Sequence, residues 1–274
     1  MGYTKNPPSS LNGLLLLTHM NRLRLSLLIL ALLLTIAAHS SSVVAQDHVI
    51  VQPRQVVIHR SAKVADGFPE RRKATVRYPI VSGLSDAIVL RRIQNMLSMK
   101  NVFGSTLPEY RRNPGLLEFD YKVNYNKNYL LHTTFTEDAE GAYPTTSTKH
   151  FLINLKNGKI IKASDAFNPD SLAALVRLVE PKLKAEINEL LQTNEEDKSA
   201  DADAKKWVRD ELTKLKYGVR NLDNFYADDR GVTFLYDAEF PHAIQALAPA
   251  GDYFFTYPEL RPYIKGNGPL GVFK

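Results

Sequence analysis

The sequence predicts an α+β fold in which helices pack on a mainly antiparallel sheet. Residues 117–126 alternate strictly between apolar and polar side chains, as a strand with one buried and one wet face does. Several such runs follow one another across short turns, whereas the helical patterns are grouped together. We therefore expect the order strand, helix, three strands, two helices, three strands.

The beginning of the chain of 274 residues has the pattern of an export signal. Arg22 and Arg24 precede an apolar run of 14 residues, 25–38, which is too short for a comfortable membrane span. Val43 and Ala45 fit the small-residue cleavage rule. We predict a signal peptide at residues 1–45, with an upstream extension and a true start at Met20. An uncleaved anchor is the alternative, and cleavage would leave a secreted or periplasmic protein without a membrane span.

The formal charge of +6 invites a nucleic-acid interpretation. Residues 1–45 carry Lys5, Arg22 and Arg24 and no acid, so the mature chain has a net charge of only +3. That is an ordinary surface, and we expect no nucleic-acid partner. The absence of cysteine excludes disulfides, thiolate nucleophiles and cysteine-based zinc sites.

The first part of the mature chain is expected to lead into the domain. Residues 46–72 hold two short apolar runs among charges and prolines, which predicts an extension or edge strand and then a linker. The domain itself is expected at 73–274. Residues 73–80 alternate and predict a strand. Ser85 is the expected cap of a helix with apolar residues at 89–97.

A β-rich segment follows a loop that we expect at residues 100–115, where glycine and proline recur. The strand at 117–126 is expected to turn back tightly into 129–136. Residues 151–155 alternate again and stop at Asn157-Gly158, which is a strong hairpin signal.

The second half begins with an apolar stripe at helical spacing over residues 168–191. Pro181 lies inside it and predicts a kink or a break. We expect an acidic loop at 193–206 and a further helix at 207–215. The remaining strands are expected in a hairpin around 228–231 and at 253–257.

No residue pattern predicts catalysis, a metal site or a cofactor. Thr145 to Thr148 lie near His150, but no nucleophile elbow is present, and sheet-edge hydroxyls are the simpler interpretation. A cleft lined by two or more of five residues would favour an enzyme, and a flat tyrosine-rich face would favour a binding protein. The five are Glu118, Asp120, His132, His150 and His242.

Four motifs in order carry a resemblance to a known family. They are YPIVSGL (78–84), GAYPTTSTKHFLINLKNGKIIKASDAF (141–167), NFYADDRGVTFLY (224–236) and YPEL (257–260). In this order they resemble the RsiV-type extracellular domain. That domain occurs in a lysozyme-sensing anti-sigma factor and in the non-catalytic part of some peptidoglycan deacetylases.

The resemblance implies binding, without catalysis, of a protein such as lysozyme or of a cell-wall glycan. Tyr143 replaces the histidine of the family's G-A-H-P turn, and the segment 238–251 is longer than usual. We expect no sigma-binding segment and no deacetylase domain. The expected binding residues are Tyr143, Pro144, His242 and Tyr253. The alternatives are an enzyme acting on envelope polymers and a structural component of the envelope.

Overall fold

The computed structural model describes residues 1–2, 47–141 and 143–274, without the side chains of residues 242 and 243. The chain divides into the units Met1–Ala45 and Gln46–Lys274, and the second contains every element described below. The expected signal peptide, the start at Met20 and the cleavage before Gln46 lie outside the described residues. None of the helices in the described part is both long and apolar enough to cross a membrane.

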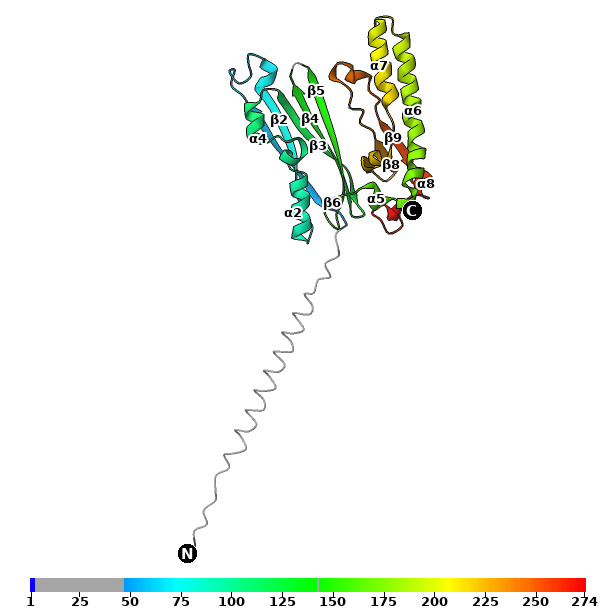
Figure 1. The fold of residues 1–274 in the computed structure, drawn as a ribbon. Helices are drawn as coiled ribbons and strands as arrows, with labels where there is room; N and C mark the ends of the chain where they lie inside the picture. Colours follow the sequence, from blue (N-terminus) through cyan, green and yellow to red (C-terminus); the bar gives the residue numbers. More distant parts are fainter. Residues whose placement is uncertain (3–46, 142) are drawn as a thin grey trace. The chain divides into compact units, whose positions relative to one another are not determined.

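The fold is α+β, as expected, with one large and one small sheet (Figure 1). The large sheet has six strands in chain order, all antiparallel except for a short parallel pairing of β2 with β3. Its strands are β1 Ile50–His59, β2 Lys73–Ser82, β3 Leu116–Lys127, β4 Leu130–Glu140, β5 Pro144–Asn154 and β6 Lys159–Ile160.

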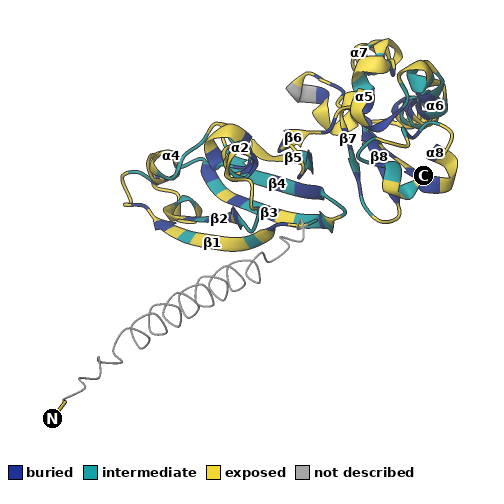
Figure 2. Cartoon of the chain, turned by 90° about the horizontal axis from the view of Figure 1, so that it is seen from below, coloured by how far each residue is buried: buried dark blue, intermediate teal, exposed yellow. Residues whose placement is uncertain are grey.

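Strand β1 is part of this sheet. It pairs with β2 along its whole length, from Ile50 opposite Ser82 to His59 opposite Lys73. Of the two interpretations of residues 46–72, the structure has the edge strand, which belongs to the compact unit Gln46–Lys274. Figure 2 shows β1 exposed over much of its length, as befits an edge.

Three short helices cover one face of the large sheet: α2 Ala87–Met96, α3 Met99–Phe103 and α4 Leu107–Arg112. Two sequence predictions are wrong here. The cap of α2 is Asp86, whose carboxylate accepts from the backbone of Ile88 and Val89, and not Ser85. The expected loop at 100–115 contains α3 and α4, because Gly104 ends one helix in the left-handed region and Pro108 lies in the first turn of the other.

The second half of the chain builds the small sheet and its helices. Strands β7, β8 and β9 pair antiparallel in that order. The strands are β7 Phe225–Ala227, β8 Gly231–Leu235 and β9 Asp252–Thr256, and the α-helices are α5 Ala163–Ala166, α6 Leu172–Glu196, α7 Ala202–Lys214 and α8 Tyr257–Leu260. Short 3₁₀ turns are η1 Pro69–Arg72, η2 Pro169–Ser171, η3 Val219–Asp223, η4 His242–Leu247 and η5 Gly271–Phe273.

Helix α6 differs from the expected helix in two respects. It runs without a break through Pro181. It also extends to Glu196, and α7 begins at Ala202, so much of the expected acidic loop is helical. The buried residues of α7, Val208 and Leu212, face the core, whereas Trp207 is exposed.

Two apolar cores lie on opposite faces of the large sheet. In Figure 1, α2 and α4 lie on one side of it, and β8, β9 and α6 lie on the other. Phe119 and Phe135 belong to the first core, and Leu130 and Leu152 belong to the second. The small sheet therefore packs against one end of the large sheet. Next to this apolar contact, polar side chains of both sheets line a cavity.

Candidate functional site

A cavity of about 560 Å³ lies between the two sheets. Strands β3, β4 and β5 supply most of one wall, and the β7–β8 hairpin supplies the other. The lining residues are chiefly polar: Arg77, Asp120, Tyr121, Lys122, Asn124, His132, Thr134, Thr136, His150, Tyr226, Asp228 and Arg230. The volume lies within the range of small-molecule sites, about 300–1,000 Å³.

The register of β4 against β5 brings two histidines together. Thr134 lies opposite His150, and His132 lies opposite Leu152. Because side chains two residues apart share a face, His132 and His150 become diagonal neighbours. Their Nε2 and Nδ1 atoms are 3.3 Å apart. The sequence did not predict this pair, since the two residues are separated by 18 positions.

An amide and a hydroxyl complete the polar cluster on this wall. The Nδ2 of Asn124 donates to Thr134 Oγ1 at 2.7 Å and lies 3.5 Å from His132 Nε2. Thr134 Oγ1 is in turn 3.1 Å from His150 Nδ1. A β-bulge follows Val123, so that Tyr125 turns from the first core to the second and leaves Asn124 facing the cavity.

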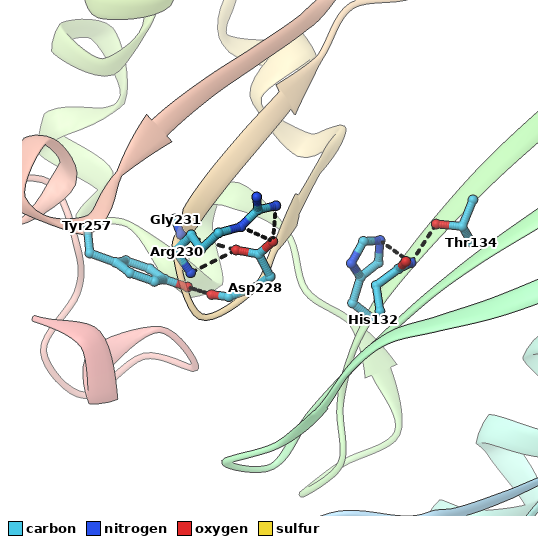
Figure 3. A network of polar contacts seen from close by, with 7 residues as sticks. His132, Thr134, Asp228, Arg230, Gly231 and Tyr257 are labelled. Carbon is cyan, nitrogen blue, oxygen red and sulfur yellow. Dashed lines mark hydrogen bonds and ion pairs between the residues drawn. The ribbon is translucent and has the colours of Figure 1, made fainter.

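Tyr226 of β7 covers both imidazoles from the small sheet. Its ring stacks on His132 with centroids 4.5 Å apart and 16° between planes, and on His150 at 4.8 Å and 18°. His132 is only 2% exposed. Figure 3 shows His132 and Thr134 on the large sheet facing the hairpin that carries Asp228 and Arg230. The aromatic stack therefore forms a packing contact between the two sheets and also lines the cavity.

Both imidazoles are neutral at physiological pH. Burial lowers the pKa of His132 to about 3, and the neighbouring His150 acts in the same direction. Burial also lowers the pKa of His150, against an opposing effect of Asp252. A neutral imidazole has one donor and one acceptor nitrogen. Among the described residues, His132 Nδ1 has no hydrogen-bond partner although it is buried.

Each carboxylate of the cavity is held by an arginine. Asp120 binds Arg77 through both oxygens, with Nη2 to Oδ2 at 2.9 Å, and Arg77 also donates to the Tyr121 carbonyl at 2.8 Å. Asp228 Oδ2 accepts from Arg230 Nε and Nη2 at 3.1 and 2.8 Å. Burial alone would raise the pKa of Asp228, but the hydrogen bonds from Arg230 outweigh it and the pKa is lowered.

The turn that presents Asp228 and Arg230 is fixed by local geometry (Figure 3). The Asp228 carboxylate accepts from the backbone of Arg230 and Gly231 at 2.8 and 3.3 Å. Position 231 needs glycine because a Cβ there would lie 2.1 Å from the Phe255 carbonyl oxygen. The hydroxyl of Tyr257 donates to the Asp228 carbonyl at 2.5 Å. The sequence did predict this hairpin, but not what it faces.

The four expected binding residues do not form one site. Tyr143 is 65% exposed and Pro144 begins β5, so both lie at the tip of the β4–β5 hairpin. Tyr253 is buried in the small sheet, where its hydroxyl donates to Glu186 at 2.9 Å, so a partner cannot reach it. The side chain of His242 lies outside the described residues. Tyr143, Pro144 and Tyr253 do not line the cavity.

Three of the five residues named as a test for an enzyme do line the cavity: Asp120, His132 and His150. Arg77, Tyr226 and Arg230 were not singled out by the sequence. The histidine pair could have been predicted from the register of β4 against β5. Once Glu140 lies opposite Pro144, the position of every other residue pair in these two strands follows. Nothing local marks the residues of the small sheet as their neighbours. Among the side chains that the structure describes, no three from histidine or acidic residues are arranged to hold a metal ion.

Comparison with known proteins gives structural neighbours only. No protein-family model and no curated protein matches the chain. A crystal structure from Bacteroides fragilis is similar, at 15% identity and a TM-score of 0.48, over 84% of this chain and 99% of that one. Another, from Pseudomonas aeruginosa, has 17% identity and a TM-score of 0.45, over 80% and 94%.

Both neighbours are DUF3298 family proteins. At these identities and TM-scores, the likeness assigns neither a family nor an activity to the chain. The RsiV-type resemblance remains a prediction from the sequence motifs.

Proposed function

We propose that this protein is an exported binding module that holds a short segment of cell-wall glycan in the cavity between its two sheets. The observation that carries the proposal is the composition of the cavity wall. It combines the stacked ring of Tyr226 with neutral imidazoles, threonine hydroxyls and two arginine–carboxylate pairs. Sugars present hydroxyls that both donate and accept, and apolar faces that lie against aromatic rings, so such a wall matches them group by group.

The charge state of the wall supports the same ligand class. The two carboxylates each lie against an arginine, so the charges are largely compensated in pairs. Lys122 is the cation of the wall without an ion-pair partner among the described residues. A nearly neutral, hydrogen-bonding cavity suits a glycan better than a polyanion. The expected signal peptide and the RsiV-type resemblance support an envelope location for such a module.

The enzyme alternative is favoured by one observation, namely that Asp120, His132 and His150 share the cavity. The state of these groups argues against it. Both oxygens of Asp120 are bound by Arg77, and with a pKa of about 3 His132 is a weak base at neutral pH. A general acid or base works best with a pKa near the operating pH.

Calorimetric titration with soluble chito-oligosaccharides and muropeptides tests the proposal. Thr136→Val keeps the shape of a cavity side chain and removes its hydroxyl. We expect affinity to fall about fivefold, the worth of one hydrogen bond of about 1 kcal/mol. Thr145→Val, at an exposed position of β5 outside the cavity lining, is the matched control and should bind as the unchanged protein does.

Two other results would replace the proposal. Turnover of peptidoglycan that disappears in Asp120→Asn would make the protein an enzyme. Binding of lysozyme that is unaffected by Thr136→Val, together with no glycan binding, would make a protein the partner and leave the cavity without this role.

A further inference from the structure

A second hollow lies at the end of the α6–α7 hairpin where α6 ends and α7 begins. It shares no residue with the cavity between the sheets. It has a volume of about 300 Å³. Its apolar walls come from three elements: Leu190 on α6, Trp207 and Val208 on α7, and Ile244 and Leu247 on η4. We call it the hairpin groove. Val208 and Ile244 are buried and form its floor.

The rim of the hairpin groove exposes two large apolar side chains. Trp207 is 42% exposed and Leu247 is 39% exposed. The buried residues of α7 are Val208 and Leu212. Trp207 is therefore not part of the buried face of α7. Tryptophan, with tyrosine and arginine, is enriched among the residues that dominate the affinity of protein interfaces. An exposed tryptophan beside an apolar hollow is therefore the arrangement of an interface anchor.

The acidic residues beside the groove indicate the charge of its partner. The segment 193–206 carries five acidic residues and three lysines, a net charge of −2, although the chain from Gln46 onward has a net charge of +3. Glu195 is paired with Arg209. The remaining acids, Glu196, Asp197, Asp201 and Asp203, are exposed and form no ion pair within the described part of the chain. A net negative charge beside an apolar groove favours a basic partner.

We infer that the hairpin groove docks a basic segment of another protein, which inserts an apolar side chain beside Trp207 and places lysine or arginine against the acidic tip. An amphipathic helix has both features on adjacent faces and fits a groove between helices. This docking site uses other elements than the glycan cavity. Its failure would leave the proposed function untouched, and the reverse also holds.

The chain has a single tryptophan, so its fluorescence reports on the groove directly. The probes are synthetic helical peptides of leucine and lysine, of leucine and glutamate, and of serine and lysine. We expect the leucine–lysine peptide alone to shift the emission of Trp207 to shorter wavelength and to protect it from acrylamide. Glu196→Gln combined with Asp197→Asn should weaken that binding about tenfold, and Leu247→Ser should do the same.

Matched controls lie elsewhere on the surface. Ile88→Ser removes a 72% exposed apolar side chain on α2, and Glu70→Gln removes an exposed acid in η1, so neither should change binding. Equal binding of the serine–lysine or leucine–glutamate peptide, or no binding of any peptide, would refute the docking site. A dimer in sedimentation that Leu247→Ser abolishes would assign the groove to a second copy instead.

Discussion

At the scale of the residue, two buried polar side chains carry the most information. His132 is held neutral by burial, and the neighbouring His150 acts in the same direction. Arg60 is 7% exposed and binds backbone carbonyls rather than a carboxylate. Both are costly to place inside a protein unless their partners are fixed, so each has a measurable effect on stability.

The stability of the protein should depend on pH through His132. In the unfolded chain its pKa is about 6.5, and in the folded protein it is about 3. Between these values the unfolded state takes up a proton that the folded state does not, so the free energy of unfolding falls as the pH is lowered. One such group accounts for on the order of 1 kcal/mol per pH unit. Above pH 6.5 its contribution is constant.

Urea titrations of the unchanged protein and of His132→Gln from pH 7.5, above this window, down to pH 4.5, inside it, measure this effect. The variant should have the shallower dependence, because it has no imidazole to protonate. His59→Gln, at an exposed position of β1, is the control and should keep the slope of the unchanged protein. Identical slopes for His132→Gln and the unchanged protein would show that His132 is not held neutral by the fold.

Arg60 joins three segments near the end of β1. Its guanidinium donates to the carbonyls of Tyr110 and Arg71 at 2.8 Å and also to that of Leu116. Arg60→Met removes the guanidinium that donates to these carbonyls and should lower the free energy of unfolding by about 2–4 kcal/mol in a denaturant titration. Arg72→Met, on an exposed neighbour, should change it by about 0.5 kcal/mol or less. Similar values for both variants would contradict this role.

At the scale of the element, the predictable features were those with a local cause. The alternation over 117–126 predicted β3, and Asp228 to Gly231 predicted the β7–β8 turn. The β3–β4 turn uses Asn128 and Tyr129, both with positive φ, slightly later than expected. The sequence did not predict the short helices α3 and α4, which have only five and six residues. In helices this short, the glycine and proline at the ends look like loop residues.

The two faces of β3 should respond differently to charge. Phe119 is fully buried in the first core, so Phe119→Asp should destabilise by several kcal/mol. Glu118 is exposed, and Glu118→Lys should change the free energy of unfolding by about 0.5 kcal/mol or less. Chemical denaturation of both variants decides the matter. Comparable losses from the two substitutions would mean that β3 does not separate a core face from a wet face.

At the scale of the whole molecule, the site exists only because the small sheet packs against the large one. The β4–β5 register alone would place His132 beside His150, but Tyr226, Asp228 and Arg230 reach them through tertiary packing. No local pattern encodes that packing, since it depends on apolar areas such as Leu130 and Leu152 matching the core of the other half. Tyr253, one of the expected binding residues, is buried within the small sheet.

A crystal structure of the protein with a bound chito-oligosaccharide or muropeptide tests the central claim most directly. We predict density for the sugar in the cavity between the sheets, with a ring face against Tyr226 and hydroxyls within hydrogen-bond distance of Thr136 and Arg230. Density only at the β4–β5 hairpin tip around Tyr143, or in the hairpin groove, would contradict the claim that this cavity is the binding site.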